Sequence, residues 1–193
     1  GALQARGIQV FADVVFNHRM GADKTEAVMA VPVDPEDRTK EIGPAREIDA
    51  WMKFTFPGRK KRYSAFQWDH RRFTGTDWDE RTKTSGVFRV AGKQWDTAVD
   101  RENANYDYLM GANVDIGSPE VFEELVRWGV WYARETGVDG FRLDAVKHIS
   151  FPFFARWLKA VRDLTGKRLP AVGEYWTGDV AVALNYLEQI DRA

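Results

Sequence analysis

The chain has 193 residues, of which 44% are hydrophobic and 30% are charged, and its net charge is −1. This composition is typical of a soluble globular protein, and the balanced charge gives no reason to expect a nucleic-acid or anionic-membrane partner. The absence of cysteine excludes disulfides and thiolate metal sites, and no apolar run reaches the roughly 18 residues that a membrane-spanning helix needs. Composition leaves the cellular compartment open.

The first stretch, residues 1–18, is expected to supply one strand of a parallel sheet. Gly7 is a helix stop, and the apolar run 8–16 is typical of a strand that is buried on both faces. Polar residues lie within this run or directly after it, namely Asp13, Asn17 and His18. Because the carboxyl ends of barrel strands face the functional rim, these three are candidate site residues. The alternative for His18 is a structural imidazole with satisfied hydrogen bonds.

Residues 19–117 are expected to form a separate, β-rich, irregular domain inserted after this strand. Turn formers interrupt short alternating runs, and a structureless loop of this length would be unusual in a compact domain. Aromatic residues are expected to supply a small core of its own, with stacking on sugars as the alternative for some of the rings, namely Trp51, Trp68, Trp78 and Trp95. The basic segments 59–62 and 70–72 superficially resemble a nucleic-acid patch, but without an accompanying motif a solvated loop is favoured.

Oxygen-bearing side chains gather late in this segment without helical periodicity, namely Asp96, Asp107, Asn113 and Asp115. Calcium takes about six to eight oxygen ligands, so such a loop suits Ca²⁺. The alternative is a solvated acidic loop.

Residues 118–193 are expected to alternate between helix and strand. Ser118 and Pro119 begin a helix that Gly137 ends, and further helices are expected over about 152–165 and 179–187. With the strand of residues 1–18, this order predicts three parallel strand–helix units with right-handed crossovers.

The last two of these strands each end in a carboxylate, Asp144 and Glu174. Side chains alternate along a strand, so Arg142 and Asp144 share one face. Arg142 should therefore lower the pKa of Asp144, although a purely structural ion pair is the alternative. Apolar neighbours of Glu174 should favour its protonated form. Two such carboxyls about 5 to 5.5 Å apart would suit a retaining glycosidase, with Asp144 as nucleophile and Glu174 as acid and base.

Segments 13–18, 140–148 and 173–176 together resemble, in order and spacing, the α-amylase family of glycoside hydrolases, and the stretches between them resemble its bacterial liquefying and intracellular members. The resemblance implies a partial (β/α)₈ TIM barrel made of the third to fifth strand–helix units. The barrel parts would be 1–18 and 118–193, with 19–117 as the inserted, calcium-associated domain. The chain would then be an internal fragment without the family's third catalytic carboxylate.

The resemblance further implies endo-acting hydrolysis of α-1,4-glucosidic bonds in starch or glycogen by retaining double displacement. Substrate would be bound by His18, Arg142, Lys147, His148, Tyr175 and Trp176. Ca²⁺ would be held by Asn17, Asp107, Asn113 and the backbone carbonyl of His148. Asp96 and Asp115 are less certain ligands, because Thr74 and Gly117, like Asn113, stand where the liquefying enzymes commonly have Asp.

Alternative functions remain at this point: a transglycosylase with the same residues, a catalytically silent glucan-binding homologue, and an unrelated metal-dependent barrel enzyme. The expected partner is an α-glucan polysaccharide, with no nucleic acid and no membrane, and the full-length protein is expected to be a monomer. The protein could be cytoplasmic or secreted. The intracellular relatives also lack parts of the second metal cluster, which favours the cytoplasm.

Overall fold

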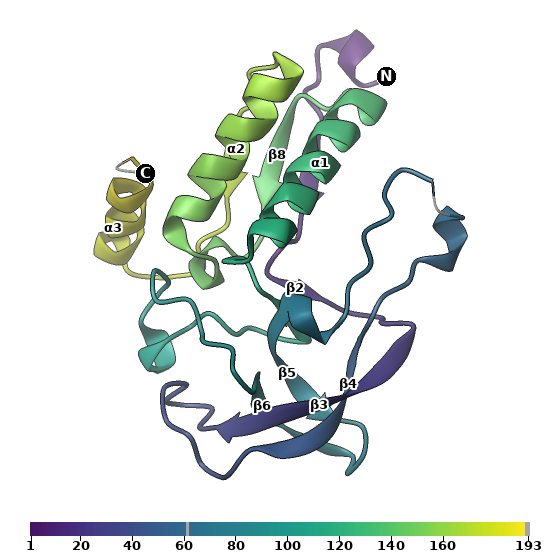
Figure 1. The fold of residues 1–193 in the computed structure, drawn as a ribbon. Helices are drawn as coiled ribbons and strands as arrows, with labels where there is room; N and C mark the ends of the chain where they lie inside the picture. The colour runs from purple at the N-terminus through teal and green to yellow at the C-terminus, as the bar shows by residue number, and fades with distance from the viewer. Residues whose placement is uncertain (61, 192–193) are drawn as a thin grey trace. The chain divides into compact units, whose positions relative to one another are not determined.

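The computed structural model describes residues 1–60 and 62–191, and its chain divides into two compact units (Figure 1). Unit 1 comprises Gly1–Phe16 and Ile116–Ala193, and unit 2 comprises Asn17–Asp115. The sequence predicts divisions after residues 18 and 117, each two residues later than the boundaries of these compact units. Lys61, part of the basic segment 59–62, lies outside the described residues.

Unit 1 contains a three-stranded parallel sheet in the order β1-β8-β9. Its strands are β1 (Phe11–Val14), β8 (Gly140–Leu143) and β9 (Ala171–Gly173), and the short 3₁₀ segment η1 (Gln4–Arg6) precedes them. Across the sheet Asp13 pairs with Arg142, which in turn pairs with Val172. These three side chains therefore point to the same face.

The helices of unit 1 are α1 (Pro119–Thr136), α2 (Phe151–Thr165) and α3 (Val180–Asp191), and the 3₁₀ turn η5 (Val146–His148) follows β8. Gly137 and Gly166 adopt the left-handed conformation that ends α1 and α2, as predicted. Ser118 and Ser150 occupy the N-cap positions without a side-chain capping bond. The Asp179 carboxylate accepts a hydrogen bond from the Ala181 N–H, at 2.8 Å, and thereby caps α3.

One face of the parallel sheet is covered by α1 and α2, which Figure 1 draws to the right and left of β8. The Phe16 and Phe141 rings each lie 5.1 Å from the Trp157 ring of α2, and the Trp157 indole donates to the Leu125 carbonyl of α1. Gly129 permits this approach, because a Cβ there would lie 2.6 Å from the indole. These aromatic contacts are the core of unit 1.

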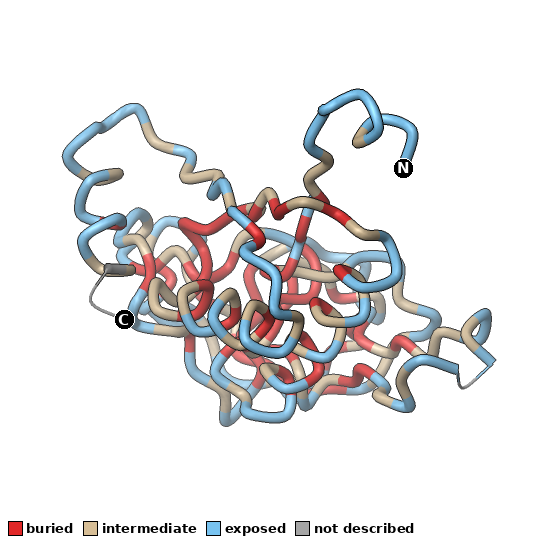
Figure 2. Tube along the Cα trace, turned by 90° about the horizontal axis from the view of Figure 1, so that it is seen from above, coloured by how far each residue is buried: buried red, intermediate tan, exposed pale blue. Residues whose placement is uncertain are grey.

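The opposite face of the sheet is largely open within the described part of unit 1. Val15 is 45% exposed and Val172 is 61% exposed, and the segment before β1 is mostly exposed as well (Figure 2). The prediction of a strand over 8–16 buried on both faces is therefore wrong. Strand pairing with β8 runs from Phe11 to Val14, and just before it Val10 exchanges hydrogen bonds with Asp139.

The open sheet edges lead to a prediction for the isolated 193-residue chain. Both β1 and β9 are edge strands of the described sheet and carry apolar residues without prolines or charges that would block pairing, apart from Asp13. We expect the chain by itself to aggregate or to lack fixed packing. Size-exclusion chromatography and a thermal melt would test this, and a soluble monomer with one cooperative transition would contradict it.

Unit 2 contains a six-stranded antiparallel sheet in the order β2-β7-β5-β6-β3-β4. Its strands are β2 (His18–Arg19), β3 (Lys24–Val33), β4 (Arg46–Lys53), β5 (Phe73–Asp79), β6 (Thr84–Val90) and β7 (Ala112–Val114). The helical segments in its described residues are short 3₁₀ turns, namely η2 (Pro57–Arg59), η3 (His70–Arg72) and η4 (Glu102–Ala104). The predicted alternating run 87–90 lies within β6, whereas of the run 53–56 only Lys53 lies in a strand.

The tryptophans of unit 2 divide between core and surface. Trp68 and Trp95 are buried, and Trp95 packs with Val33, Val87 and Tyr108. Trp51 is 41% exposed, so the prediction that it belongs to the core is wrong. The Trp51 and Trp78 indoles both donate to the Glu80 carboxylate, which holds them at the polar surface.

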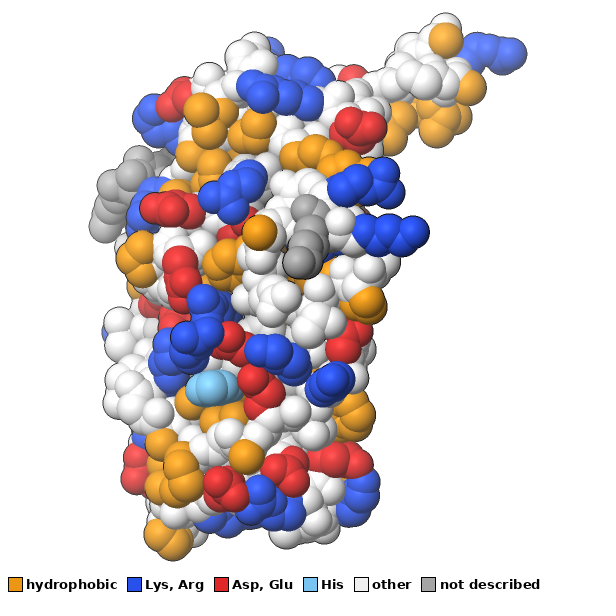
Figure 3. All heavy atoms as spheres, turned by 45° about the vertical axis from the view of Figure 1, so that its right-hand side comes forward, with side chains coloured by type: hydrophobic (Ala, Val, Ile, Leu, Met, Phe, Trp, Pro, Cys, Tyr) orange, Lys and Arg blue, Asp and Glu red, His pale blue; other side chains and the backbone are white. Residues whose placement is uncertain are grey.

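Arginines of the basic segments contact other residues of unit 2. Arg71 and Arg72 bond the Asp69 carboxylate at 2.7 and 2.8 Å, and these hydrogen bonds hold the pKa of Asp69 below its ordinary value. The Arg59 guanidinium lies 4.1 Å from the centre of the Phe56 ring. Figure 3 shows acidic and basic side chains interspersed on the face that it draws. Of the described helices, none has the length and apolar character to cross a membrane.

Candidate active site

Asp144 and Glu174 directly follow neighbouring parallel strands. The Asp144 N–H donates to the Val14 carbonyl at 3.0 Å, and the Glu174 N–H donates to the Leu143 carbonyl at 2.9 Å. The hydrogen-bond ladder therefore continues one residue beyond β8 and β9. The backbone of both acidic residues is fixed by the sheet that carries them.

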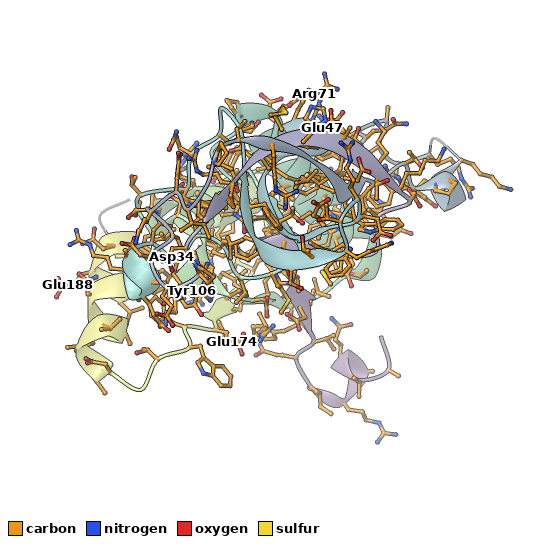
Figure 4. The ribbon with its side chains drawn as sticks, turned by 90° about the horizontal axis from the view of Figure 1, so that it is seen from below. Asp34, Glu47, Arg71, Tyr106, Glu174 and Glu188 are labelled. Carbon is orange, nitrogen blue, oxygen red and sulfur yellow. The ribbon has the colours of Figure 1, made fainter. Side chains whose placement is uncertain are left out.

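Arg142 links three carboxylates on the open face of this sheet. Its Nη1 bonds Asp13 at 2.6 Å and Asp144 at 2.8 Å, and its Nη2 bonds Glu174 at 2.6 Å. Figure 4 labels Glu174, with nitrogen- and oxygen-bearing side chains beside it. The Asp13 hydrogen bond is the largest of the contacts that raise the pKa of Arg142. The two terminal nitrogens of one guanidinium thus bring Asp144 and Glu174 together.

The pKa of Asp144 is raised overall, so the predicted net lowering is wrong, although Arg142 itself acts to lower it as predicted. Burial of the carboxyl group is the largest cause, and the charges of Glu174 and Asp13 act in the same direction. Arg142 opposes these effects by its hydrogen bond and its charge, but it is shared among three acids. A single cation cannot neutralise three carboxylates, so burial and repulsion prevail.

The turn after β8 is tied to the residues after β9. Ala145 adopts a left-handed conformation with φ of 52°, which is uncommon for a residue with a side chain, and the Val146 N–H donates to the Glu174 carbonyl at 3.2 Å. The Lys147 ammonium donates to the Trp176 carbonyl at 3.2 Å. The backbone after Asp144 and the backbone around Glu174 therefore support each other.

The remaining predicted substrate-binding residues of unit 1 differ in accessibility. Lys147 and His148 are buried, whereas Trp176 is 78% exposed. The Tyr175 ring lies 5.0 Å from the Tyr186 ring of α3 and packs there. Trp176 therefore offers a free aromatic surface, and Tyr175 serves packing at least in part.

The predicted calcium ligands Asn17, Asp107 and Asn113 are neighbours in unit 2, and all three are buried. The Asn17 amide donates to the Asp107 carbonyl at 3.1 Å, and the Asn113 amide donates to Asp107 Oδ2 at 3.1 Å and to Thr74 Oγ1 at 2.8 Å. Burial raises the pKa of Asp107 well above its ordinary value.

The Asn113 carbonyl oxygen Oδ1 is buried without a hydrogen-bond partner, beside the buried Asp107 carboxylate. A buried oxygen without a hydrogen-bond donor can instead coordinate a cation, and Ca²⁺ prefers such oxygen ligands, so these residues fit Ca²⁺. Among the described residues no three His, Cys, Asp or Glu side chains converge as a metal site. The donor set is therefore one carboxylate with two amides, and His148, the fourth predicted ligand, belongs to unit 1.

The family model for the catalytic domain of alpha-amylase matches residues 1–191. The chain belongs to the alpha-amylase family. It is 55% identical over 188 residues to the alpha-amylase of Geobacillus stearothermophilus, which covers 96% of this chain and 34% of the relative. It is 50% identical over 188 residues to the alpha-amylase of Bacillus licheniformis, with 97% and 37% covered. The chain thus spans about a third of the length of these relatives.

Solved structures agree with this family at the level of the fold. An alpha-amylase from Anoxybacillus superimposes with a TM-score of 0.53 at 18% identity, covering 97% of this chain and 29% of the other. The chain therefore has the TIM-barrel glycosidase fold of the alpha-amylase family.

Two side-chain contacts in this member of the alpha-amylase family were not predicted from the sequence. Asp13 was a candidate site residue, but its bond to Arg142 was not predicted, although the pairing of residues 13 and 142 across the sheet would suggest it. The second is the contact of Lys93, whose ammonium donates to Asp115 Oδ2 at 2.6 Å. Nothing in the sequence signals that second contact. His18 lies on β2, where its Nδ1 is 3.3 Å from Asn17 Oδ1.

Proposed function

We propose that the protein containing this chain hydrolyses internal α-1,4-glucosidic bonds of starch-like glucans by retaining double displacement, within a barrel that this chain forms in part. The observation that carries the proposal is that the Arg142 guanidinium bonds both carboxylates, Asp144 at 2.8 Å and Glu174 at 2.6 Å. Carboxyls on neighbouring strand ends, bonded to one guanidinium, suit the separation of about 5 to 5.5 Å that a retaining mechanism uses.

In this mechanism Asp144 attacks the anomeric carbon while Glu174 donates its proton to the departing glycosidic oxygen. The products of this step are a covalent glycosyl–Asp144 ester and a free sugar chain. Glu174, now ionised, removes a proton from water, which attacks the anomeric carbon and releases Asp144. Arg142 orients Asp144 and favours its ionised form against the effect of burial.

Substrate binding is assigned to residues around these acids and to His18. Trp176 offers an exposed ring on which a sugar can stack, and Lys147, His148 and Tyr175 would line the leaving-group side. His18 would contact the sugar at the cleaved bond. The supporting observations are the positions of residues 147, 148, 175 and 176 directly after β8 and β9.

Calcium is assigned to Asn17, Asp107 and Asn113 of unit 2, and the backbone carbonyl of His148 is a ligand that the family resemblance alone implies. The unpartnered Asn113 Oδ1 and the buried Asp107 carboxylate support this assignment. Bound calcium would neutralise the Asp107 carboxylate, and it would link Asn17 at the start of unit 2 to Asn113 near its end. Because Asn17 directly precedes His18, it would also fix the backbone that carries this histidine.

Two other functions within the same family are alternatives. A transglycosylase would transfer the glycosyl group of Asp144 to a sugar hydroxyl instead of water. A silent glucan-binding homologue would not need Asp144, Glu174 and Arg142 in mutual contact, and their contacts favour catalysis. We propose that the full-length protein acts as a monomer on α-glucan.

Product analysis of the full-length protein with soluble starch tests the function. We expect a rapid fall in viscosity with few reducing ends, and proton NMR of the first products should show the α-anomer. A β-1,4-linked glucan serves as the control substrate and should stay intact. First products in the β-configuration would contradict the retaining mechanism. Products longer than the substrate would identify a transglycosylase instead.

A further inference from the structure

After β4 the chain leaves the sheet of unit 2 and forms one loop, residues 55–67, that returns to its starting point. Its base is closed by Phe54 and Trp68, whose backbones exchange hydrogen bonds at 2.9 and 3.2 Å. The Asp23 carboxylate reinforces this base, because it accepts a hydrogen bond from the Thr55 N–H at 2.6 Å. A loop with its ends joined in this way is an Ω-loop, and Figure 1 shows it extending away from β4.

The backbone at the tip of this loop is held by hydrogen bonds between near neighbours. The Arg62 N–H donates to the Arg59 carbonyl at 2.9 Å, and the Ser64 N–H donates to the Arg62 carbonyl at 3.0 Å. Lys60 and Tyr63 adopt left-handed conformations with φ of 48° and 72°. Residues with side chains seldom adopt this conformation, so extending the backbone here relieves strain. Opening of the tip therefore breaks short-range hydrogen bonds and leaves the paired base intact.

The same tip displays basic side chains to solvent. Lys60 and Arg62 are exposed, and Tyr63, which follows Arg62, is 67% exposed. Arg59 differs, because its guanidinium donates to the Phe66 carbonyl at 2.8 Å. A trypsin-like serine protease selects Lys or Arg before the bond that it cuts, by means of a carboxylate in its specificity pocket, and exposed loop tips are preferred sites of nicking. The bond after Arg62 combines both requirements.

We propose that the Arg62–Tyr63 peptide bond is a site of limited proteolysis by trypsin-like serine proteases, and that the cleaved protein stays folded as two associated chains. Water supplies the atoms of the reaction. Its oxygen joins the Arg62 carbonyl carbon, which becomes a carboxylate, while the carbon–nitrogen bond breaks. The nitrogen of Tyr63 takes up the two hydrogens of the water molecule and becomes a new, charged amino terminus.

The sheet of unit 2 contains strands from both sides of this bond. Before the bond lie β2, β3 and β4, and after it lie β5, β6 and β7. Pairing crosses from one group to the other twice, between β2 and β7 and between β3 and β6. At the base of the loop, the Phe54 ring also packs against the Phe73 ring, with 5.8 Å between centroids. These contacts do not depend on the cleaved bond, so we expect them to hold the two chains together.

Lys83 offers a matched comparison in the turn between β5 and β6. Its side chain is 65% exposed and its φ is 57°, so it shares both exposure and left-handed strain with the loop tip. The turn is bounded directly by the two strands, because Asp79 pairs with Thr84. An extended conformation here requires the end of the strand pair to separate, which adds to the cost of opening. The bond after Lys83 should therefore stay intact in the folded protein.

The experiment treats the folded full-length protein with a low proportion of trypsin. We expect two bands in a denaturing gel, and amino-terminal sequencing of the newly formed chain should begin at Tyr63. On native size-exclusion chromatography the cleaved protein should elute at the volume of the uncleaved protein. The triple variant Lys60→Gln, Lys61→Gln and Arg62→Gln removes every basic side chain that follows Arg59 in the tip, and it should lose its intact chain at least about tenfold more slowly.

The control is Lys83→Gln, which should be cleaved at the rate of the unaltered protein and at the same bond. A first cut at any other bond would overturn the assignment of Arg62 and Tyr63, and this readout does not depend on how the variants fold. A triple variant that is cleaved as fast as the control would also overturn it. Separation of the two chains on native chromatography would overturn the inference that the sheet of unit 2 holds them together.

Discussion

Replacing Asp144 with asparagine is expected to lower kcat for starch hydrolysis by more than about a hundredfold in the full-length enzyme. The amide cannot form the glycosyl ester, and a loss of this size corresponds to about 3 kcal/mol of activation free energy. The side chain keeps its shape and an oxygen that can accept the 2.8 Å bond from Arg142. Starch binding should therefore persist while turnover is lost.

The measurement for this variant combines initial rates of reducing-sugar release with a starch-binding assay. Asp163→Asn is the matched control, because Asp163 is exposed on α2 and pairs with Lys159. It should retain the wild-type rate. If Asp144→Asn kept more than about a hundredth of the wild-type kcat, Asp144 would not be the nucleophile. A variant that lost starch binding and melted early would indicate a structural role instead.

Replacing Glu174 with glutamine should produce a loss that depends on the leaving group. Starch needs protonation of a poor leaving group, so its hydrolysis should fall strongly, by about a hundredfold or more. A maltosyl fluoride or an aryl glycoside with an acidic phenol departs with little help, so its first step should suffer much less. Pre-steady-state release of fluoride or phenol measures that first step directly.

The control for this variant is Glu135→Gln, an exposed position near the end of α1. It should leave the rates on both kinds of substrate unchanged. Equal losses on starch and on the activated substrate would argue that Glu174 is not the proton donor. They would fit a role in which Glu174 only positions Arg142, to which it is bonded at 2.6 Å.

Local signals predicted the helices of unit 1 well. Pro119 and the left-handed glycines Gly137 and Gly166 mark boundaries that depend on the backbone alone. The end of α3 was missed, because the residues after 187 contain no stop signal and the helix continues to residue 191. The strand over 8–16 was predicted too long, because hydrophobicity does not reveal where pairing with a neighbouring strand stops.

The candidate site was predictable to the extent that it depends on alternation within a strand. Arg142 and Asp144 share a face, as their spacing of two requires. The bonds from Arg142 to Asp13 and Glu174 depend on the pairing of three strands, which no local pattern contains. The raised pKa of Asp144 depends on burial and on those same neighbours, so its direction could not be obtained from residue types.

The pair of Lys93 and Asp115 joins positions 22 residues apart in one chain, and this has a consequence for how the protein meets its environment. A metal ion taken from solution dissociates when its free concentration falls below the dissociation constant. The ammonium of a side chain stays at the local concentration that the fold imposes, however dilute the surroundings become. Neutralisation of Asp115 by this side chain is therefore independent of the supply of ions in solution.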